Sequence, residues 1–216
     1  MTGAYTKQYF LARNVLDMTI AQGVADFAES KNVKKILDVG CGTGRLVSFL
    51  NSRGFKTYGC DAQKEALTLA RKINQKKLIT LTKATNLPYK NNSFDLVTAI
   101  SVIEHLTKNE AGKFIAEARR VLKTNGFIFL VTPNYASIFR LIFGSKWFAY
   151  QDPTHITFFT TKSLSELLNQ KGFKKPNTIF KVNIKKINTK TLFSFLTHST
   201  PLANWRDSFW ISAQKG

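Results

Sequence analysis

Residues 36–44 read I-L-D-V-G-C-G-T-G, a short apolar run that passes directly into three glycines at alternate positions. An apolar run bounded by turn signals predicts a buried parallel strand, and a helix is expected to begin near Gly44. Glycine permits a positive φ and lets a ligand approach the backbone closely, while the first N–H groups of the helix can face that ligand. The stretch therefore predicts a ligand-binding loop at the carboxyl end of a strand.

Outward from this loop, strand patterns and helix patterns alternate along the chain. Further strands are expected at 56–60, 78–81, 94–100 and 127–131, and helices at 8–29, 45–53, 63–74 and 110–123. Such alternation predicts an α/β fold, in which a doubly wound and mostly parallel sheet carries helices on both faces.

The end of the chain departs from this alternation. After a helix expected at 163–171, residues 178–187 alternate in polarity, and residues 207–214 form a last candidate strand. Two late strands without a helix between them predict an antiparallel pair at one edge of the sheet. With no repeat or linker, residues 1–216 are expected to form a single domain, with an N-terminal helical segment over 1–30 and a lid-like insert over 135–160.

The glycine spacing and the next strand indicate the kind of ligand. The loop reads G-x-G-x-G, not the G-x-G-x-x-G of dinucleotide-binding proteins. Asp61 ends the second predicted strand, where a carboxylate can accept hydrogen bonds from ribose hydroxyls. Asp61 could instead cap the helix over 63–74. Because the glycine loop and the acid occur together, we favour ribose binding.

Four more stretches follow the glycine loop and Asp61 in a recognisable order. They are L-P-Y-K-N-N-S-F-D-L-V (87–97), S-V-I-E-H-L (101–106), V-L-K-T-N-G-F (121–127) and V-T-P-N (131–134). With this set, the chain resembles the class I S-adenosylmethionine-dependent methyltransferases. The resemblance implies a methyltransferase with a Rossmann-like sheet of seven strands, whose last strand runs antiparallel between its neighbours.

The resemblance also implies a set of residues that bind the methyl donor. Asp38 and the glycine loop would face its methionine part, Ala84 and Thr85 would flank the adenine, and Ser101 would lie near the sulfonium. The full set is Asp38, Gly40, Cys41, Gly42, Gly44, Asp61, Ala62, Ala84, Thr85, Ile100 and Ser101. The chain departs from the family at Lys83, where an Asp that bonds the adenine is common.

Glu104, His105 and His155 are the catalytic candidates. The run D-P-T-H-I-T-F-F-T-T-K-S-L (152–164) resembles the branch of ubiquinone-biosynthesis O-methyltransferases, sugar and lipid-linked methyltransferases and small-RNA 2′-O-methyltransferases. Some members hold a divalent metal with Glu-x-x-Glu-His and a later histidine, and here Ser101 replaces the first glutamate. Loss of a carboxylate weakens a hard-cation site, so a metal is not favoured. His105 or His155 is then the candidate general base, and packing against the following turn is the other role open to Glu104 and His105.

Residues 135–151 form an insert that is rich in aromatic and aliphatic side chains. They read Y-A-S-I-F-R-L-I-F-G-S-K-W-F-A-Y-Q, between the fifth strand and His155. An insert at the mouth of a crevice commonly covers the substrate, which makes a lid the favoured interpretation. Peripheral membrane contact aided by Arg140 and Lys146 and a packed extra helix are the alternatives.

The charge balance is strongly basic, with 32 Lys and Arg against 13 Asp and Glu and a formal net charge of +19. This excess fits RNA, anionic lipid or a phosphorylated substrate, and equally a basic surface without a specific partner. The leading hypothesis is O-methylation of a small or lipid-linked hydroxyl compound. An RNA methyltransferase and a non-catalytic cofactor-binding protein are the alternatives.

Several features exclude other classes. Cys41 and Cys60 are too few for a disulfide framework and lack zinc-ligand spacing. No apolar run approaches the ~18 residues that would indicate a transmembrane segment. The first residues lack the order of a signal peptide, so a cytoplasmic location is expected.

Overall fold

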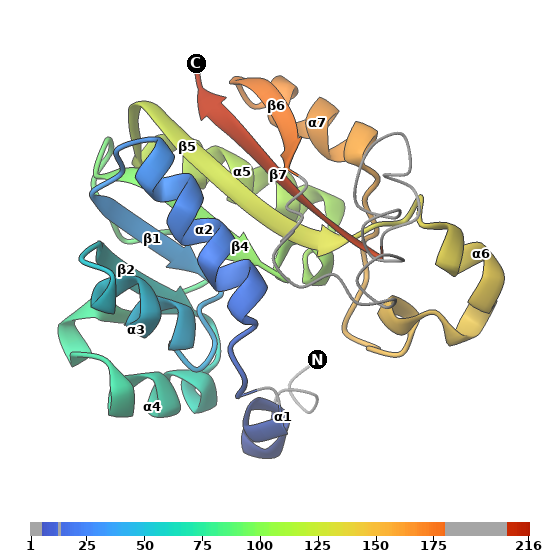
Figure 1. The fold of residues 1–216 in the computed structure, drawn as a ribbon, viewed down its shortest axis with the longest axis horizontal. Coiled ribbons are helices and arrows are strands. Elements are labelled where there is room, and N and C mark those ends of the chain that lie inside the picture. Colours follow the sequence, from blue (N-terminus) through green and yellow to red (C-terminus); the bar gives the residue numbers. More distant parts are fainter. Residues whose placement is uncertain (1–5, 13, 180–206) are drawn as a thin grey trace, which may run out of the picture.

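The protein is a seven-stranded sheet covered by helices, seen in a computed structural model that describes residues 6–12, 14–179 and 207–216 (Figure 1). The strands are β1 (Lys35–Val39), β2 (Lys56–Asp61), β3 (Ile79–Leu81), β4 (Phe94–Ile100), β5 (Leu122–Pro133), β6 (Phe173–Ile179) and β7 (Ser208–Lys215). The helices are α1 (Lys7–Ala12), α2 (Met18–Ser30), α3 (Arg45–Ser52), α4 (Lys64–Ile73), α5 (Lys108–Val121), α6 (Ile138–Phe143) and α7 (Thr161–Gln170). Single 3-10 turns are η1 (Lys76–Leu78), η2 (Ile103–His105), η3 (Gly144–Lys146) and η4 (Phe148–Tyr150).

The strand order is β3-β2-β1-β4-β5-β7-β6. The strands from β3 to β5 pair in parallel, and β7 pairs antiparallel with both β5 and β6. This confirms the predicted doubly wound sheet and its antiparallel last strand. The order reverses between β1 and β4, and a crevice at such a switch point is the usual ligand site of an open α/β sheet.

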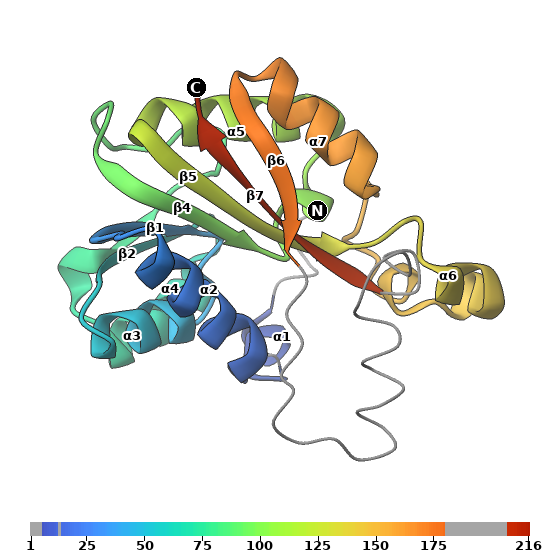
Figure 2. The ribbon, with the colours of Figure 1, turned by 45° about the horizontal axis from the view of Figure 1, so that its top comes forward.

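Helices lie on both faces of the sheet, as the alternation predicted. Helices α2, α3 and α4 cover one face, and α5 and α7 cover the other (Figure 2). Neighbouring residues of β1 point to opposite faces, so Ile36 joins the core on the α2 side while Leu37 joins the core on the α5 side. The continuous apolar run in this strand therefore reflects burial on both faces.

The N-terminal segment differs from the prediction of one helix over 8–29. It forms α1 and α2 with a break between them, because the Asp17 carboxylate accepts hydrogen bonds from the N–H groups of Thr19 and Ile20 and caps a new helix. The break lets α1 turn away from α2 (Figure 1).

The sixth strand also differs, since β6 begins at Phe173 and not at residue 178. A proline such as Pro176 is disfavoured inside a strand, but β6 is an edge strand, where a missing backbone N–H is tolerated. The ladder slips between Lys174 and Asn177, on either side of the proline. Residues 180–187 of the predicted strand lie outside the described residues.

Candidate functional site

The glycine loop joins β1 to α3 with a backbone that other residues rarely adopt. Gly40, Gly42 and Gly44 all have positive φ, at 71°, 52° and 74°. A Cβ on Gly40 would run into the side chain of Val102, whereas one on Gly42 would meet no protein atom within 4 Å. Gly42 therefore presents bare backbone to the crevice, which is the surface that a ligand can approach closely.

Asp61 ties the end of β2 to this loop. Its carboxylate accepts hydrogen bonds from the backbone N–H of Gly42 at 2.9 Å and from that of Gln63 at 2.9 Å. Burial raises the pKa of Asp61, and the backbone hydrogen bonds oppose that rise. Gln63, not Asp61, is the cap residue of α4, and its side chain makes no capping bond. The Asp61 carboxylate thus fixes the glycine loop through Gly42. The alternative that Asp61 is the N-cap residue of the following helix is wrong.

Asp38 lies under the loop as a buried carboxyl group. Thr98 Oγ1, on the neighbouring strand β4, donates to Asp38 Oδ1 at 2.7 Å. Burial raises the pKa of Asp38 to about 7, partly opposed by the Thr98 hydrogen bond. A carboxyl group this far from water favours its neutral form unless a cation is placed beside it.

Two adjoining cavities open beside the loop. One, of about 310 Å³, is lined by Asp61, Ala62, Ala84 and Thr85, with Lys83 also on its wall. The other, of about 490 Å³, is lined by Asp38, Cys41, Ile100 and His155 among others. Gly40, Gly42, Ser101 and His105 line both. The first is called here the donor cavity and the second the acceptor cavity.

The structure brings most of the predicted residues to these cavities but not Gly44 or Glu104. Gly44 lies off both walls, where a Cβ would meet Asn74 and Ala70. Glu104 is buried behind the acceptor cavity. Ser101 has a φ of 53°, an uncommon conformation for a residue with a side chain, at the junction of the two cavities.

Tyr9 and Phe10 of α1 line both cavities, and sequence reasoning did not place them there. Tyr9 Oη donates to Asp152 Oδ2 at 3.4 Å, which links α1 to the insert region across the acceptor cavity. The signal that could have shown this is Asp17, since a cap residue in the middle of an apolar periodicity marks a helix start.

Both histidines of the acceptor cavity are oriented by carbonyl groups. His155 Nδ1 lies 2.7 Å from the carbonyl oxygen of Ala149, and His105 Nδ1 lies 3.1 Å from that of Thr154. Because a carbonyl oxygen can only accept, Nδ1 carries the hydrogen in each ring, and Nε2 is the basic nitrogen of the neutral form. The two rings lie 4.7 Å apart between centroids, so they share one corner of the cavity.

A short network behind His105 supports this tautomer. Thr154 Oγ1 lies 3.0 Å from His105 Nδ1, but its single proton is given to Asp152 Oδ1 at 2.5 Å. Burial raises the pKa of Asp152, and the hydrogen bonds from Thr154 outweigh it and hold that pKa below the ordinary value. The carboxylate therefore lies charged near both histidines, and a negative neighbour stabilises an imidazole that has taken up a proton.

Glu104 adds a buried carboxyl group with one unsatisfied oxygen. Its Oε2 accepts from Thr132 Oγ1 at 3.0 Å, while Oε1 is buried without a hydrogen-bond partner. Burial raises the pKa of Glu104 to about 7, with the hydrogen bonds opposing it. A buried polar atom without a partner calls for an explanation such as an ion, a water or a catalytic role.

Glu104, His105 and His155 together have the chemistry of a metal site. One ligand atom from each lies within 4.8 Å of the others. An unsatisfied carboxylate oxygen and two imidazoles fit a divalent transition ion better than Mg²⁺, which prefers oxygen donors. The three residues fit such an ion, although the carboxylate that the family branch adds is replaced by Ser101.

The insert is fixed to the rest of the fold by buried polar contacts. Trp147 Nε1 and Ser137 Oγ both donate to Asp207 Oδ1, at 2.8 and 3.0 Å. Trp147 is fully buried, and Phe148 beside it lines the acceptor cavity. The insert thus contributes a side chain to the cavity wall, as the lid interpretation expects.

Comparison with known proteins agrees with this geometry. A sequence model described as a methyltransferase domain matches residues 37–130, which include the glycine loop, Asp61 and His105. A S-adenosylmethionine-dependent methyltransferase of Thermotoga maritima superposes with a TM-score of 0.69 at 20% identity, over 97% of this chain and 94% of its own. Residues 37–130 therefore resemble a methyltransferase domain, and the chain shares the fold of S-adenosylmethionine-dependent methyltransferases.

The curated relatives of this chain extend beyond the matched part. A ubiquinone biosynthesis O-methyltransferase of Pelagibacter ubique is 32% identical over 48% of the chain and 43% of its own length. An uncharacterized protein of Methanocaldococcus jannaschii is 27% identical over 76% of the chain and 69% of its own length. Others bear the names of O-, N- and tRNA methyltransferases, and the chain spans between 26% and 33% of their lengths. The names therefore agree on methyl transfer and differ in the acceptor.

None of the helices in the described part of the chain is both long and apolar enough to cross a bilayer.

Proposed function

We propose that this chain is a methyltransferase, which moves the methyl group of S-adenosylmethionine to the oxygen of a small or lipid-linked hydroxyl compound. The observation that carries the proposal is the pair of imidazoles at one corner of the acceptor cavity, His105 and His155, each with Nδ1 hydrogen-bonded to a carbonyl oxygen. Two basic Nε2 atoms beside the donor site suit an acceptor that must lose a proton, as a hydroxyl must.

In this proposal the donor cavity orients the methyl donor. Asp61 accepts from the ribose hydroxyls, Ala84 and Thr85 flank the adenine, and the open side of Gly42 admits the sulfur-bearing part. Asp38 lies below the loop as the nearest carboxyl group, and a cation beside it favours its charged form. Methyl transfer needs little more than this alignment, since the donor is already activated.

The proton step belongs to the histidine pair. The acceptor oxygen attacks the methyl carbon as the carbon–sulfur bond breaks, and Nε2 of His155 or His105 takes the hydroxyl proton. The carboxylate of Asp152 stabilises the resulting imidazolium, since it lies close enough for both histidines to lower its pKa. Residues 135–160 act as the lid, because Phe148 and His155 come from this segment and close the cavity.

A metal-assisted form of the same reaction is the second candidate for the chemistry. It is favoured by the unsatisfied Oε1 of Glu104 within the cluster with His105 and His155. A divalent ion held by these three residues would polarise the acceptor oxygen as a Lewis acid. Activity that chelation abolishes and Mn²⁺ or Mg²⁺ restores would select this form, and full activity in chelator would leave the histidines as bases.

RNA is the second candidate for the acceptor, supported by the net charge of +19 and by the tRNA methyltransferase named among the relatives. Charge reversal of lysines near the end of the chain would test RNA binding. The lysines concerned lie outside the described residues, at Lys181, Lys185 and Lys186. A purely cofactor-binding protein is disfavoured, because it would not need an acceptor cavity beneath the insert.

The decisive experiment is a turnover screen with isotopically labelled methyl donor. The full chain is incubated with pools of metabolites, lipids and RNA, and labelled products are identified by mass. The proposal expects O-methylated small or lipid-linked products that disappear with His105→Ala and His155→Ala in combination. Label found only in RNA would replace the proposed acceptor, and turnover unchanged in the double variant would remove the histidines from the reaction.

A further inference from the structure

The second half of α6 is an apolar surface that the described part of the chain leaves uncovered. Leu141, Ile142 and Phe143 are 69%, 65% and 54% exposed, and we call these three residues the α6 tip. Large apolar side chains that are exposed one by one are ordinary, but three in succession on one projection mark an interaction surface.

The α6 tip stands on a fixed base. On the inner side of the insert Trp147 is buried and hydrogen-bonded to Asp207, and the carbonyl of Ala149 holds His155. On the outer side α6 projects past the carboxyl end of β5, away from α2, α3 and α4 (Figure 1). The tip is therefore presented to solvent by a segment that is itself anchored in the core.

The apolar surface continues toward the acceptor cavity. Phe148 follows the tip by five residues, is 46% exposed, and also lines that cavity with His155. Tyr150, also exposed, packs edge-on against the buried Trp147 with ring centroids 5.1 Å apart. A surface that binds the tip would thus also lie close to the mouth of the acceptor cavity.

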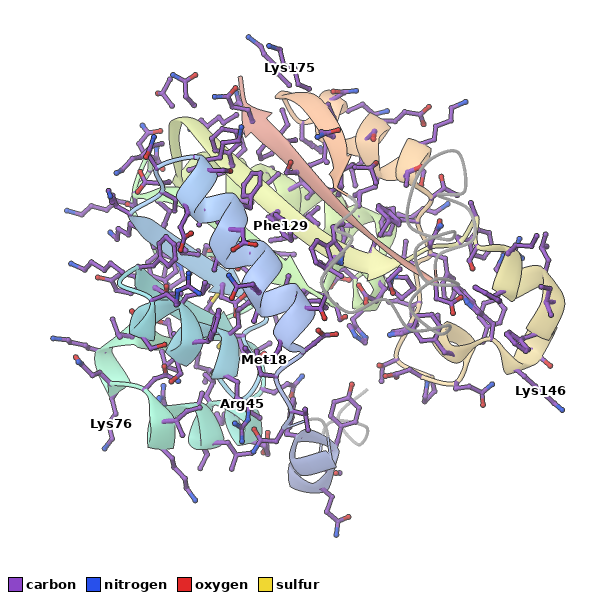
Figure 3. All side chains as sticks on the ribbon, viewed as in Figure 1. Met18, Arg45, Lys76, Phe129, Lys146 and Lys175 are labelled. Carbon is purple, nitrogen blue, oxygen red and sulfur yellow. The ribbon has the colours of Figure 1, made fainter. Side chains whose placement is uncertain are left out.

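The charge around the tip is positive. Residues 135–151 contain Arg140 and Lys146 and no acidic residue. The Arg140 guanidinium lies over the Tyr135 ring at 4.3 Å, which keeps it beside the tip, and Lys146 extends away from the body of the protein (Figure 3). Apolar side chains that are flanked by cations, on a chain of net charge +19, complement an anionic lipid surface.

We propose that the α6 tip inserts into the interface of an anionic lipid bilayer, with Arg140 and Lys146 on the headgroups. This orientation places the mouth of the acceptor cavity at the bilayer surface. The acceptor would then be an amphiphile in the bilayer whose hydroxyl end enters the acceptor cavity. This consequence rests on the function proposed above. An RNA would need cations where the tip has apolar groups, and a second copy would bring another +19 charge.

Sedimentation with lipid vesicles tests the docking without methyl donor or acceptor. The full chain is mixed with vesicles of phosphatidylcholine alone and of phosphatidylcholine with phosphatidylglycerol. The variant combines Leu141→Ser, Ile142→Ser and Phe143→Ser, and it should bind the anionic vesicles at least about tenfold more weakly than the parent. Lys146→Glu should weaken vesicle binding by a smaller factor. The effect of this substitution should decrease at high salt, because salt screens the attraction between lysine and the headgroups.

The matched control is Ile73→Ser at the end of α4, because Ile73 is 48% exposed and far from α6. A chain with this net charge is attracted to anionic lipid whatever its apolar surface. The proposal is therefore tested by the difference in vesicle affinity between the tip variant and this control. Binding of the control within about twofold of the parent supports the proposal. If the triple variant does not keep the melting temperature of the parent, Leu141→Ser and Ile142→Ser are measured singly.

Equal binding of parent and tip variants would overturn the proposal, as would a parent that fails to sediment with anionic vesicles. Conversion of a parent dimer to monomer by the tip variant, without vesicle binding, would assign the tip to a second copy instead. Turnover of a water-soluble hydroxyl acceptor is measured separately and in the parent, because the vesicle assay contains neither donor nor acceptor. A failure of the protein to bind vesicles thus leaves the proposed reaction untouched. Absence of turnover in the parent refutes the proposed reaction and leaves the vesicle binding untouched.

Discussion

The donor side and the acceptor side of the crevice are built in different ways. On the donor side, the glycine loop and Asp61 come from consecutive strand ends and are joined by a hydrogen bond from Gly42 to Asp61. On the acceptor side, Tyr9 of α1, His105 after β4 and His155 within the segment 135–160 meet from three distant parts of the chain. Short-range backbone geometry sets the first, and tertiary packing of separate segments sets the second. The donor should accordingly be held by few residues, and the acceptor chemistry should depend on contacts across the fold.

The largest expected effect separates chemistry from donor binding. His155→Ala should lower kcat by about 10²- to 10⁴-fold, the usual contribution of a general base. His155 lines only the acceptor cavity, so the affinity for S-adenosylhomocysteine in calorimetry should stay within about threefold of the parent. A variant that lost both would contradict the division into two sides.

The next effect is a pH dependence of stability that arises at the buried Asp38, below the glycine loop. The folded chain holds a proton on Asp38 up to about pH 7, whereas the unfolded chain releases it near pH 3.8. The free energy of unfolding should therefore fall as pH rises through this window and level off above it. Asp38→Asn should remove roughly 4 kcal/mol of this fall, measured by urea unfolding without methyl donor. Parallel curves for variant and parent would show that Asp38 is charged in the folded chain.

A somewhat smaller effect is expected at the ribose site. Asp61→Ala removes the acceptor of the ribose hydroxyls and the bond that fixes Gly42, so the affinity for S-adenosylhomocysteine should fall about 30- to 100-fold. Asp61→Asn keeps one oxygen and should lose less. The same affinity in Asp61→Ala and parent would remove Asp61 from donor binding.

The smallest effect serves as a control for the acceptor side. Thr107 and Glu110 form a capping box at the start of α5, away from the acceptor cavity, while Glu110 also lines the donor cavity. Thr107→Ala should cost about 1 kcal/mol of stability and lower Tm by about 2–4 °C. The value of kcat at room temperature, measured with saturating donor, should be unchanged. A large loss of kcat would mean that general destabilisation accounts for the effect of His155→Ala.

The sequence predicted the sheet and the backbone of the glycine loop well. The run into Gly40, Gly42 and Gly44 specifies its own backbone, and Asp61 at a strand end is placed by the parallel topology alone. The capping box of Thr107 and Glu110 is equally local, since its two residues lie three positions apart. These features depend on residues close in the chain or on adjacent strands.

The remainder depended on packing that no local pattern encodes. Tyr9 and Phe10 reach the cavities only because Asp17 starts a second helix and α1 turns back. The start of β6 is hard to predict because the strand contains Pro176. A proline is tolerated in a strand mainly when that strand lies at the edge of a sheet, and the sequence does not show which strand is at the edge. The tautomers of His105 and His155 follow from carbonyl groups of the insert, whose path the sequence does not specify.

A crystal structure of the full chain with S-adenosylhomocysteine tests the division into donor and acceptor sides most directly. The account predicts the ribose hydroxyls within hydrogen-bond distance of Asp61, the adenine beside Ala84, and the sulfur at Ser101. It also predicts that His105 and His155 lie on the far side of the sulfur, across the space left for the acceptor. A ribose that does not contact Asp61, or a ligand that fills the corner between the two histidines, would contradict it.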